Sequence, residues 1–526
     1  MVVIRTLNPL HSLLTLNFKL YTMKNLKYLS IILTFAFLGC SDLDEEPVGL
    51  LSPEGFFQSP EDVQTIINGA IGNMATEKYW GRKLSTAIML RSDMVTIADQ
   101  GTTQARRDAD NFQMLADNGL INELWPKSYQ IIAGTNEAIA AANIMDAPAQ
   151  QLDPIKAQAH FFRAYTYYHL VRLFGDIPYL DTPVDNIDQA KEIEKTSQEE
   201  VYQKIIADLQ EAKTHLPDQQ PTRSLPSKAT AAAYLASVYL TLGQFEQAYD
   251  EANFVISNEG RFNLGLASDY QELFDATKQN SLTEPLLTLD FNGLSDGDTG
   301  RDYTPALTGI RANERGDIGG GWSVSVPSIT VYNEWDGRDY RKAVSLDTTG
   351  IFNGVEEFFT EFPRFDSRNV SSAYIAKYTR YIGNSVDGNG RSSSFNYALM
   401  RYAEVLLIAA EALNEISPGS AEATVYLNRV RARARNGNPA AYPQDVAPGL
   451  SQDAFRDLVL EERKWELSFE FKRWYDIKRR NLGVEVFGTN GLEHQASFDP
   501  NRDYLLPLPA EELERNTNLQ PNNPGY

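Results

Sequence analysis

A Gly-x-Ser-x-Gly pattern at residues 293–297 is the first group of residues in this chain that could carry out a reaction. In one class of hydrolases this pattern holds a nucleophilic serine between a strand and a helix, with an acid and a histidine later in the chain. The preceding residues are compatible with a strand, but Asp298–Pro305 is not a helical sequence, and the only later histidine is His494. A glycine-rich turn is therefore the favoured interpretation over a catalytic serine.

Residues that often bind metals are present, but their spacing does not match a known type of metal site. Asp296 and Asp298 resemble the start of a calcium-binding loop, yet the twelfth position is Leu307, where such a loop needs a bidentate glutamate. His160 and His169 lie nine residues apart, unlike the close histidine pairs of zinc sites. We therefore predict no metal and no cofactor, and leave calcium at an irregular loop as the open alternative.

Four glutamates near the C-terminus could suggest a glycosidase, because that class of enzyme uses two carboxylates. They are Glu461, Glu462, Glu466 and Glu470. Basic residues alternate with them at helical spacings of three and four, namely Arg463, Lys464, Lys472 and Arg473. Oppositely charged residues at these spacings form ion pairs along a helix, so a lattice of ion pairs is the favoured interpretation.

Aromatic residues in irregular segments are the remaining chemical signal. They are Tyr79, Trp80, Tyr303, Trp322, Tyr332 and Trp335. Flat rings stack on the apolar faces of sugars, while polar neighbours bind the hydroxyl groups. For any single ring, packing in a small satellite core is the favoured alternative, but for the set we predict at least one binding ring. We assign ligand binding to Tyr79, Trp80, Tyr303 and Trp322, and prefer Trp322 because three glycines precede it.

The elements that must position these rings are mainly helices. Residues 232–243 carry apolar and small side chains on one helical stripe, and a turn at residues 242–245 leads to a second amphipathic stretch. Small residues, a glycine turn and a following aromatic residue are typical of tetratricopeptide repeats. Less regular versions occur at residues 124–144, at residues 155–174 with 199–216, and at residues 398–416 with 421–434. A long final helix is predicted over residues 452–480.

The chain between the two helical regions has a different character. Helical repeats are expected at about residues 121–257 and 398–480, whereas residues 258–397 are rich in Gly, Asp, Ser and aromatic residues, with a strand-like piece at Leu286–Phe291. Long loops on a helical scaffold are usually functional. The predicted fold class is therefore mainly α: one body of tetratricopeptide-like repeats at residues 40–526, with a loop-rich, partly β lobe that carries the ligand surface.

The N-terminal residues have the pattern of a targeting signal. A short basic stretch precedes the apolar run Tyr28–Leu38, which is too short to span a membrane and is typical of a signal peptide. Gly39 and Cys40, the only cysteine of the chain, follow it, so we predict cleavage after residue 39 and a lipid anchor on Cys40. The alternative is a buried strand that ends in an ordinary cysteine. We take Met23 as the start, which leaves residues 1–22 untranslated.

Charge and composition exclude several classes of function. The 526 residues carry a net charge of −22, and loss of residues 1–39 removes four basic residues and no acidic one. An acidic chain is a poor match for nucleic acid, because phosphate binding needs a basic surface. A single cysteine excludes an internal disulfide. Acidity also disfavours strongly anionic polymers, although a local pair such as Arg106–Arg107 could reverse this.

Several segments resemble one known family. Phe162–Ala164 with Leu173–Pro178, Arg401–Glu404 with Ala410–Ala412, Asn428–Ala432, Glu461–Asp476 and Leu506–Tyr526 are similar to the blocks of the SusD/RagB family of nutrient-binding outer-membrane lipoproteins. The similarity runs from Cys40 to Tyr526. These blocks build the scaffold of the family and not its ligand site, so no site residue can be carried over.

The resemblance implies a function as well as a fold. It implies a helical body with four tetratricopeptide-like units that captures an oligo- or polysaccharide at the cell surface. The implied partner is a SusC-like TonB-dependent transporter of the outer membrane, and the acidic residues after Cys40 resemble a surface-export signal. A binding protein is thus expected rather than an enzyme. A helical glycan-active enzyme and a tetratricopeptide-type protein-interaction scaffold are the alternatives.

Overall fold

The computed structural model describes residues 57–184, 186–294, 300–310, 321–352, 354–361, 372–385 and 390–526. The predicted signal peptide, Cys40 and the acidic residues after it lie outside this part of the chain. The same holds for residues 295–299, which contain the serine of the Gly-x-Ser-x-Gly pattern and the two aspartates of the calcium-like loop. One compact unit contains the residues from Phe57 to Tyr526.

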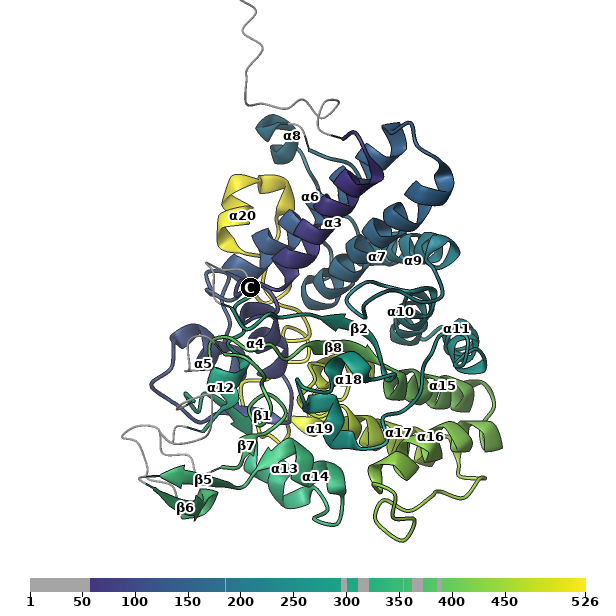
Figure 1. Ribbon diagram of the computed structural model, residues 1–526. Coiled ribbons are helices and arrows are strands. Elements are labelled where there is room, and N and C mark those ends of the chain that lie inside the picture. The colour runs from purple at the N-terminus through teal and green to yellow at the C-terminus, as the bar shows by residue number, and fades with distance from the viewer. Residues whose placement is uncertain are drawn as a thin grey trace, which may run out of the picture. The chain divides into compact units, whose positions relative to one another are not determined.

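Eight long helices form four pairs that pack on one another in chain order (Figure 1). The pairs are α3 (Pro60–Met74) with α6 (Ile121–Ile144), α7 (Ala149–Phe174) with α9 (Gln198–His215), α10 (Lys228–Thr241) with α11 (Phe245–Ser257), and α15 (Tyr402–Ile416) with α16 (Ala421–Ala434). Neighbouring pairs also touch, because α6 packs on α7, α9 on α10, and α11 on α15. The mainly α, repeat-like architecture predicted from the sequence is confirmed, but the prediction did not count α3 among the repeat helices.

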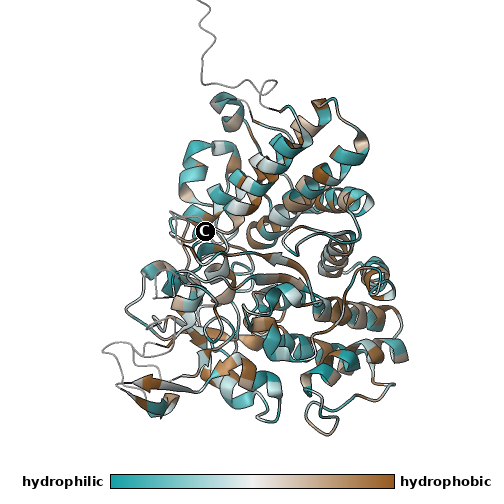
Figure 2. Cartoon of the chain, in the orientation of Figure 1, coloured by the Kyte–Doolittle hydropathy of each residue, from teal (hydrophilic) through white to brown (hydrophobic). Residues whose placement is uncertain are grey.

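Local sequence explains why these helices form and pack closely. The Ser197 side chain accepts a hydrogen bond from the backbone N–H of Glu200 at 3.3 Å, and Ser420 caps α16 in the same way. In α10 the small residues Ala229, Ala231, Ala232, Ala233 and Ala236 are buried. Figure 2 shows hydrophilic and hydrophobic residues side by side on the same helices. Small buried side chains let neighbouring helices approach one another closely.

The strands of the described chain are short and pair two by two. The antiparallel pairs are β1 (Val95–Ile97) with β3 (Ser325–Pro327), β2 (Pro285–Leu289) with β8 (Tyr397–Arg401), β4 (Leu346–Asp347) with β7 (Tyr374–Ile375), and β5 (Thr349–Phe352) with β6 (Val355–Phe358). The predicted strand near residues 286–291 is confirmed as β2. The helix predicted from residue 398 is wrong at its start, because Ala398 pairs with Thr288 in the ladder and α15 begins at Tyr402.

Shorter elements connect these parts. The α-helices are α4 (Lys83–Met89), α5 (Gln104–Asp110), α8 (Ile187–Lys191), α12 (Thr304–Thr308), α13 (Ile329–Glu334), α14 (Tyr340–Ser345), α17 (Gln452–Glu466), α18 (Arg473–Arg479), α19 (Gly483–Val486) and α20 (Ala510–Arg515). The 3₁₀ helices are η1 (Tyr270–Phe274), η2 (Gln279–Ser281), η4 (Phe359–Glu361) and η5 (Thr517–Leu519). None of the helices in the described ranges is both long and apolar enough to cross a membrane.

The long final helix predicted over residues 452–480 is wrong, because it is broken into α17 and α18. Between them Phe469 and Phe471 take left-handed backbone angles, with φ of 63° and 62°. Such angles are uncommon for residues other than glycine and end a helix. The break turns Glu470 and both phenylalanines into the core, where each is less than 9 % exposed. Long-range packing therefore overrides the helical pattern at this point.

The predicted lattice of ion pairs along one helix is mostly wrong as well. Lys464 and Glu461 do pair, at 2.6 Å. The other glutamates point into the core and take their partners from other elements. Glu466 contacts the guanidinium groups of Arg341, Arg401 and Arg433, with Nη1–Oε distances of 3.1 Å for Arg341 and 2.9 Å for Arg401.

Further buried charges extend this cluster. Glu470 pairs with Arg401 at 2.7 Å and with Lys377 at 2.8 Å. Glu284 lies against Arg401 at 2.5 Å and against Arg433 at 2.7 Å. These links join the residue before β2 to β8, α16 and the break after α17. The network therefore ties the loop-rich lobe to the helical body.

Candidate functional site

Tyr79 and Trp80 lie in the core and not on an exposed platform. Tyr79 is 0 % exposed and Trp80 3 %. The Trp80 ring packs on Phe471 and on His169, with ring centroids 5.3 Å apart in both contacts. The chain turns back on itself after α3, and this turn directs both rings inward. The prediction that these two rings are exposed for ligand stacking is therefore wrong.

Tyr303 and Trp322 come together in a small satellite cluster with Leu307 and Val324. The two ring centroids lie 5.7 Å apart with an interplanar angle of 53°. Tyr303 is 6 % exposed, so the prediction of an exposed ring is wrong for it too. Trp322 is half-buried and keeps part of its ring at the surface. Of the four rings assigned to ligand binding, only Trp322 retains the exposure that the assignment needs.

Close approaches of backbone segments hold this cluster. The Tyr303 N–H donates to the Gly81 carbonyl at 2.8 Å, and the Trp322 N–H donates to the Ala306 carbonyl at 2.6 Å. A Cβ added at Gly81 would lie 2.0 Å from the carbonyl oxygen of Arg301, a distance that no side chain can occupy. The turn with Tyr79 and Trp80 is thus a neighbour of the segment with Tyr303. Their contact goes through backbone rather than through a shared ring surface.

Guanidinium groups surround the two rings, and sequence reasoning did not single them out. The Arg82 guanidinium lies 4.7 Å from the Tyr303 ring centroid, and that of Arg391 lies 5.5 Å from the Trp322 ring centroid. Arg301 donates from Nη1 to the Tyr303 hydroxyl at 3.1 Å. Burial and the nearby charge of Arg82 lower the pKa of Arg106 to about 10. We call this region, made of Arg82, Tyr303, Trp322, Arg301 and Arg391, the Trp322 surface.

The Trp322 surface combines groups that could bind a ligand. A partly exposed indole offers an apolar face, and guanidinium groups lie around the two rings, of which Arg82 also pairs with Glu77. The carboxyl group next in the chain to this cluster, Asp302, is wholly buried, and burial raises its pKa. It accepts hydrogen bonds from Tyr397 and from Ser393, the latter at 2.7 Å. Asp302 therefore links its own segment to the segment with Ser393 and Tyr397 within the protein, and it is not exposed to a ligand.

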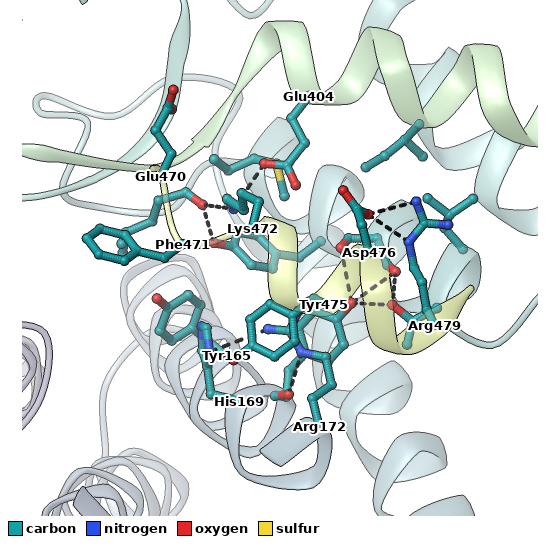
Figure 3. A pocket seen from close by; sticks show the side chains of 18 of the residues that line it. Tyr165, His169, Arg172, Glu404, Glu470, Phe471, Lys472, Tyr475, Asp476 and Arg479 are labelled. Atoms are coloured by element: carbon teal, nitrogen blue, oxygen red, sulfur yellow. Dashed lines mark hydrogen bonds and ion pairs between the residues drawn. The ribbon is translucent and has the colours of Figure 1, made fainter. Parts of the chain in front are cut away.

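A small cavity of about 40 Å³ lies between α7, α10, α15 and α18 (Figure 3). Around it, Lys472 pairs with Glu404 at 3.0 Å and Arg479 with Asp476 at 2.8 Å. His169 shares a hydrogen bond of 2.9 Å with Tyr475, and burial holds the pKa of this histidine well below its usual value. One water needs about 10–15 Å³, so the cavity has room for waters but not for a sugar. It belongs to the scaffold.

The histidine and acidic side chains of the described residues are not grouped as metal ligands. In the described ranges, no cluster of three or more His, Cys, Asp or Glu side chains is arranged to hold a metal ion. His160 instead hydrogen-bonds Asp208 at 2.7 Å, and Asp208 also accepts from Arg163. This histidine therefore sits in a buried polar network of α7 and α9.

Comparison with known proteins assigns the chain to a family. A family model described as "SusD family" matches residues 283–526, and a second, described as "Starch-binding associating with outer membrane", matches residues 43–240. SusD-like protein P2 of Formosa agariphila is 54 % identical over 506 residues, which cover 96 % of this chain and 100 % of that protein. The chain belongs to the SusD family. The resemblance stated from the sequence blocks is confirmed.

Solved structures of the SusD family share the fold. Surface glycan-binding protein A from Bacteroides fluxus matches with a TM-score of 0.75 at 21 % identity, over 89 % of this chain and 100 % of that one. A laminarin-binding SusD-like protein matches with a TM-score of 0.73 at 20 % identity, over 89 % and 100 % of the two chains. These matches extend across the helical pairs and the loop-rich lobe together. They establish the mainly α, tetratricopeptide-like fold of this SusD-family chain.

Proposed function

We propose that this chain is a lipid-anchored protein of the cell surface that binds a glycan and delivers it to a SusC-like TonB-dependent transporter of the outer membrane. Membership of the SusD family supports the proposal, as do two structural neighbours whose names state glycan or laminarin binding. The family description that matches residues 43–240 refers to starch binding and to association with the outer membrane. A binding role, without catalysis, is part of the proposal.

The observation that carries the glycan proposal is the Trp322 surface. Its indole is half-buried, so the ring is held by Tyr303 and Val324 while part of it faces outward. A sugar ring can stack on the exposed part, and the positive charge of Arg391 lies beside the ring. Tyr303 acts here as a support for Trp322.

Trp322→Ala is expected to weaken glycan binding by about 1–3 kcal/mol, the range for losing a stacked ring or a large apolar contact. The melting temperature should change little, because the ring belongs to a small satellite cluster and not to the main core. Isothermal titration calorimetry with the cognate glycan, beside thermal melts, measures both quantities.

A second exposed ring provides the matched control. Tyr381→Ala removes an aromatic side chain that is 45 % exposed and lies outside the Trp322 surface. We expect wild-type affinity for this variant. Wild-type affinity in Trp322→Ala would reject the proposed platform, and a large fall in its melting temperature would instead assign the ring to the core.

The lipid anchor rests on the sequence alone, because Cys40 lies outside the described residues. Cys40→Ala is expected to abolish palmitate labelling and to move the protein out of the membrane fraction, since acyl chains supply the membrane affinity of such a protein. Ser41→Ala is the control and should stay labelled. Labelling that persists in Cys40→Ala would reject the anchor, because the chain has no other cysteine.

Delivery to a transporter is tested separately from glycan binding. The full-length lipoprotein, extracted with mild detergent from its own membrane, should co-purify with a TonB-dependent transporter. A preparation in which the lipoprotein is abundant and no such transporter accompanies it would reject this part of the proposal.

A further inference from the structure

A polar groove of about 380 Å³ lies away from the Trp322 surface, between the loop that joins α9 to α10, η2, the end of β2 and the segment before β8. Its size is near the lower end of the range for small-molecule sites, about 300–1,000 Å³. Amide and hydroxyl side chains dominate its lining, with one guanidinium and one carboxylate. Such a lining differs from that of the small cavity of Figure 3, which combines paired charges with aromatic and apolar side chains.

Hydrogen bonds to the backbone hold one wall of the groove rigid. Gln279 donates from Nε2 to the Ser394 carbonyl at 2.8 Å and accepts from the Asn396 N–H at 2.8 Å. Asn396 in turn accepts at Oδ1 from the Phe291 N–H at 3.2 Å. This leaves the Nδ2 group of Asn396 as a donor without a partner in the described part of the chain. Its position is set before any ligand arrives.

The two charged residues of the groove, Asp290 and Arg223, are also positioned by hydrogen bonds. Asp290 is exposed, and its Oδ1 accepts from the Thr288 hydroxyl at 2.8 Å. Arg223 donates from Nη2 to the Asn263 carbonyl at 2.8 Å, and its own carbonyl accepts from the Thr288 N–H. Within the described ranges, Arg223 has no carboxylate at ion-pair distance. One positive and one negative group thus line a groove that is otherwise neutral.

These groups match the hydroxyl groups of a sugar. Each sugar hydroxyl donates one hydrogen bond and accepts others, so neighbouring hydroxyls need donors and acceptors side by side. Asn396 and Arg223 supply donors, and Asp290 supplies a charged acceptor, which forms stronger hydrogen bonds than a neutral one. The balance of charge favours a neutral sugar over an anionic one.

We propose that this groove is a second glycan-binding site, which takes a neutral stretch of an oligosaccharide through its hydroxyl groups. The inference rests on the proposed function and extends it. Residues 391 and 396 are five positions apart, so their Cα atoms are at most about 18 Å apart, given at most about 3.6 Å per residue. The groove is therefore close enough to the Trp322 surface for one polysaccharide chain to pass near both.

The test uses two isosteric substitutions in a background that lacks the first site. Asp290→Asn keeps an acceptor for Thr288 but removes the charge, and Asn396→Asp keeps the acceptor for Phe291 but removes the donor. Exposed residues at the end of α6 offer matched controls, Asp146→Asn and Asn143→Asp. Each change is made in full-length protein that carries Trp322→Ala. The probes are short neutral oligosaccharides of glucose, mannose, galactose and xylose at millimolar concentrations, measured by calorimetry with thermal melts.

We expect at least one of these oligosaccharides to bind the Trp322→Ala protein, and Asp290→Asn and Asn396→Asp each to weaken that binding about tenfold or more. The two control substitutions should leave it unchanged. The proposal is overturned if none of the four probes binds the Trp322→Ala protein, or if binding is undiminished in both groove variants with unchanged melting temperatures.

The result also separates the two sites. If Trp322→Ala does not weaken binding relative to wild type while Asp290→Asn does, the Trp322 surface is rejected and the groove stands. If Trp322→Ala abolishes binding of every probe, the groove is rejected and the Trp322 surface stands.

Discussion

Glu466→Gln is expected to lower the free energy of unfolding by about 3–5 kcal/mol, the usual cost of removing one partner from a buried ion pair. The substitution preserves the size of the side chain, so packing is not the cause. Glu466 is 0 % exposed and contacts Arg341, Arg401 and Arg433. Removing its charge leaves these guanidinium groups with one negative partner fewer in a region that water does not reach. Urea unfolding followed by circular dichroism measures the change.

Because of the Glu466 carboxylate, the free energy of unfolding is expected to decrease at acid pH. Burial acts to raise the pKa of Glu466, but the charges of Arg433, Arg401 and Arg341 outweigh it and hold the pKa at about 2, below the ordinary value of 4.5. Because the folded pKa is the lower one, the stabilisation by Glu466 is complete above the ordinary pKa and is lost as pH falls toward 2. The wild-type protein should therefore lose stability more steeply than Glu466→Gln between about pH 5 and 2.

Glu511→Gln is the matched control on another helix, α20. Its side chain is 64 % exposed and pairs at 2.9 Å with Arg515, which is 65 % exposed, and exposed pairs of this kind contribute about 0–1 kcal/mol. We expect little change in stability and an unaltered pH profile. If Glu466→Gln behaved like this control, the buried cluster would not be the link between the lobe and the helical body.

The helical body could be predicted from the sequence because its signals are local. Apolar and small residues at positions 232, 235, 236, 239 and 240 recur every three or four positions, and that spacing alone predicts a helix; the structure buries this stripe together with most of the rest of α10. The strand β2 was predictable for a similar reason, since five residues in a row are apolar or β-branched and all are buried. Neither feature depends on a distant partner.

The direction of the aromatic rings could not be predicted, because distant residues decide it. Tyr79 and Trp80 occur in an irregular, polar stretch, which is typical of exposed loops. Trp80 is nevertheless covered by His169 and Phe471, which are far away in the sequence. Gly81 was a usable signal, since a glycine directly after two large rings indicates a tight turn against another backbone segment.

The ion-pair partners of the C-terminal glutamates could not be predicted either, because most of them are far away in the sequence. Helical spacing reveals only neighbours three or four positions away, which is why the Glu461–Lys464 pair was predictable. Glu466 finds Arg341 and Arg401 on other elements, and no glycine or proline marks the break that follows it. A carboxylate that faces the core has an identical local pattern to one that faces solvent.

Trp474→Ala should destabilise the protein by about 3–5 kcal/mol, the range for deleting a large buried ring. Trp474 is 1 % exposed and packs near Phe112 and Tyr504, with ring centroids 6.1 Å away in both cases. The guanidinium of Arg91 lies 4.7 Å from its ring. Arg91 is itself 1 % exposed, donates a hydrogen bond to the Asp503 carbonyl and also lies 4.8 Å from the Phe112 ring centroid, so the Trp474 ring is one of the groups that contact its guanidinium.

A graded substitution separates packing from recognition in this block. Trp474→Phe keeps an aromatic face beside Arg91 and loses only part of the volume, so its melting temperature should lie between those of wild type and Trp474→Ala. Glycan affinity, measured below the melting temperature of each variant, should stay near wild type, because this ring is enclosed by the scaffold and the Trp322 surface is built from other segments. Unchanged melting with lost glycan binding in Trp474→Ala would reverse the assignment and place the C-terminal block in the ligand site.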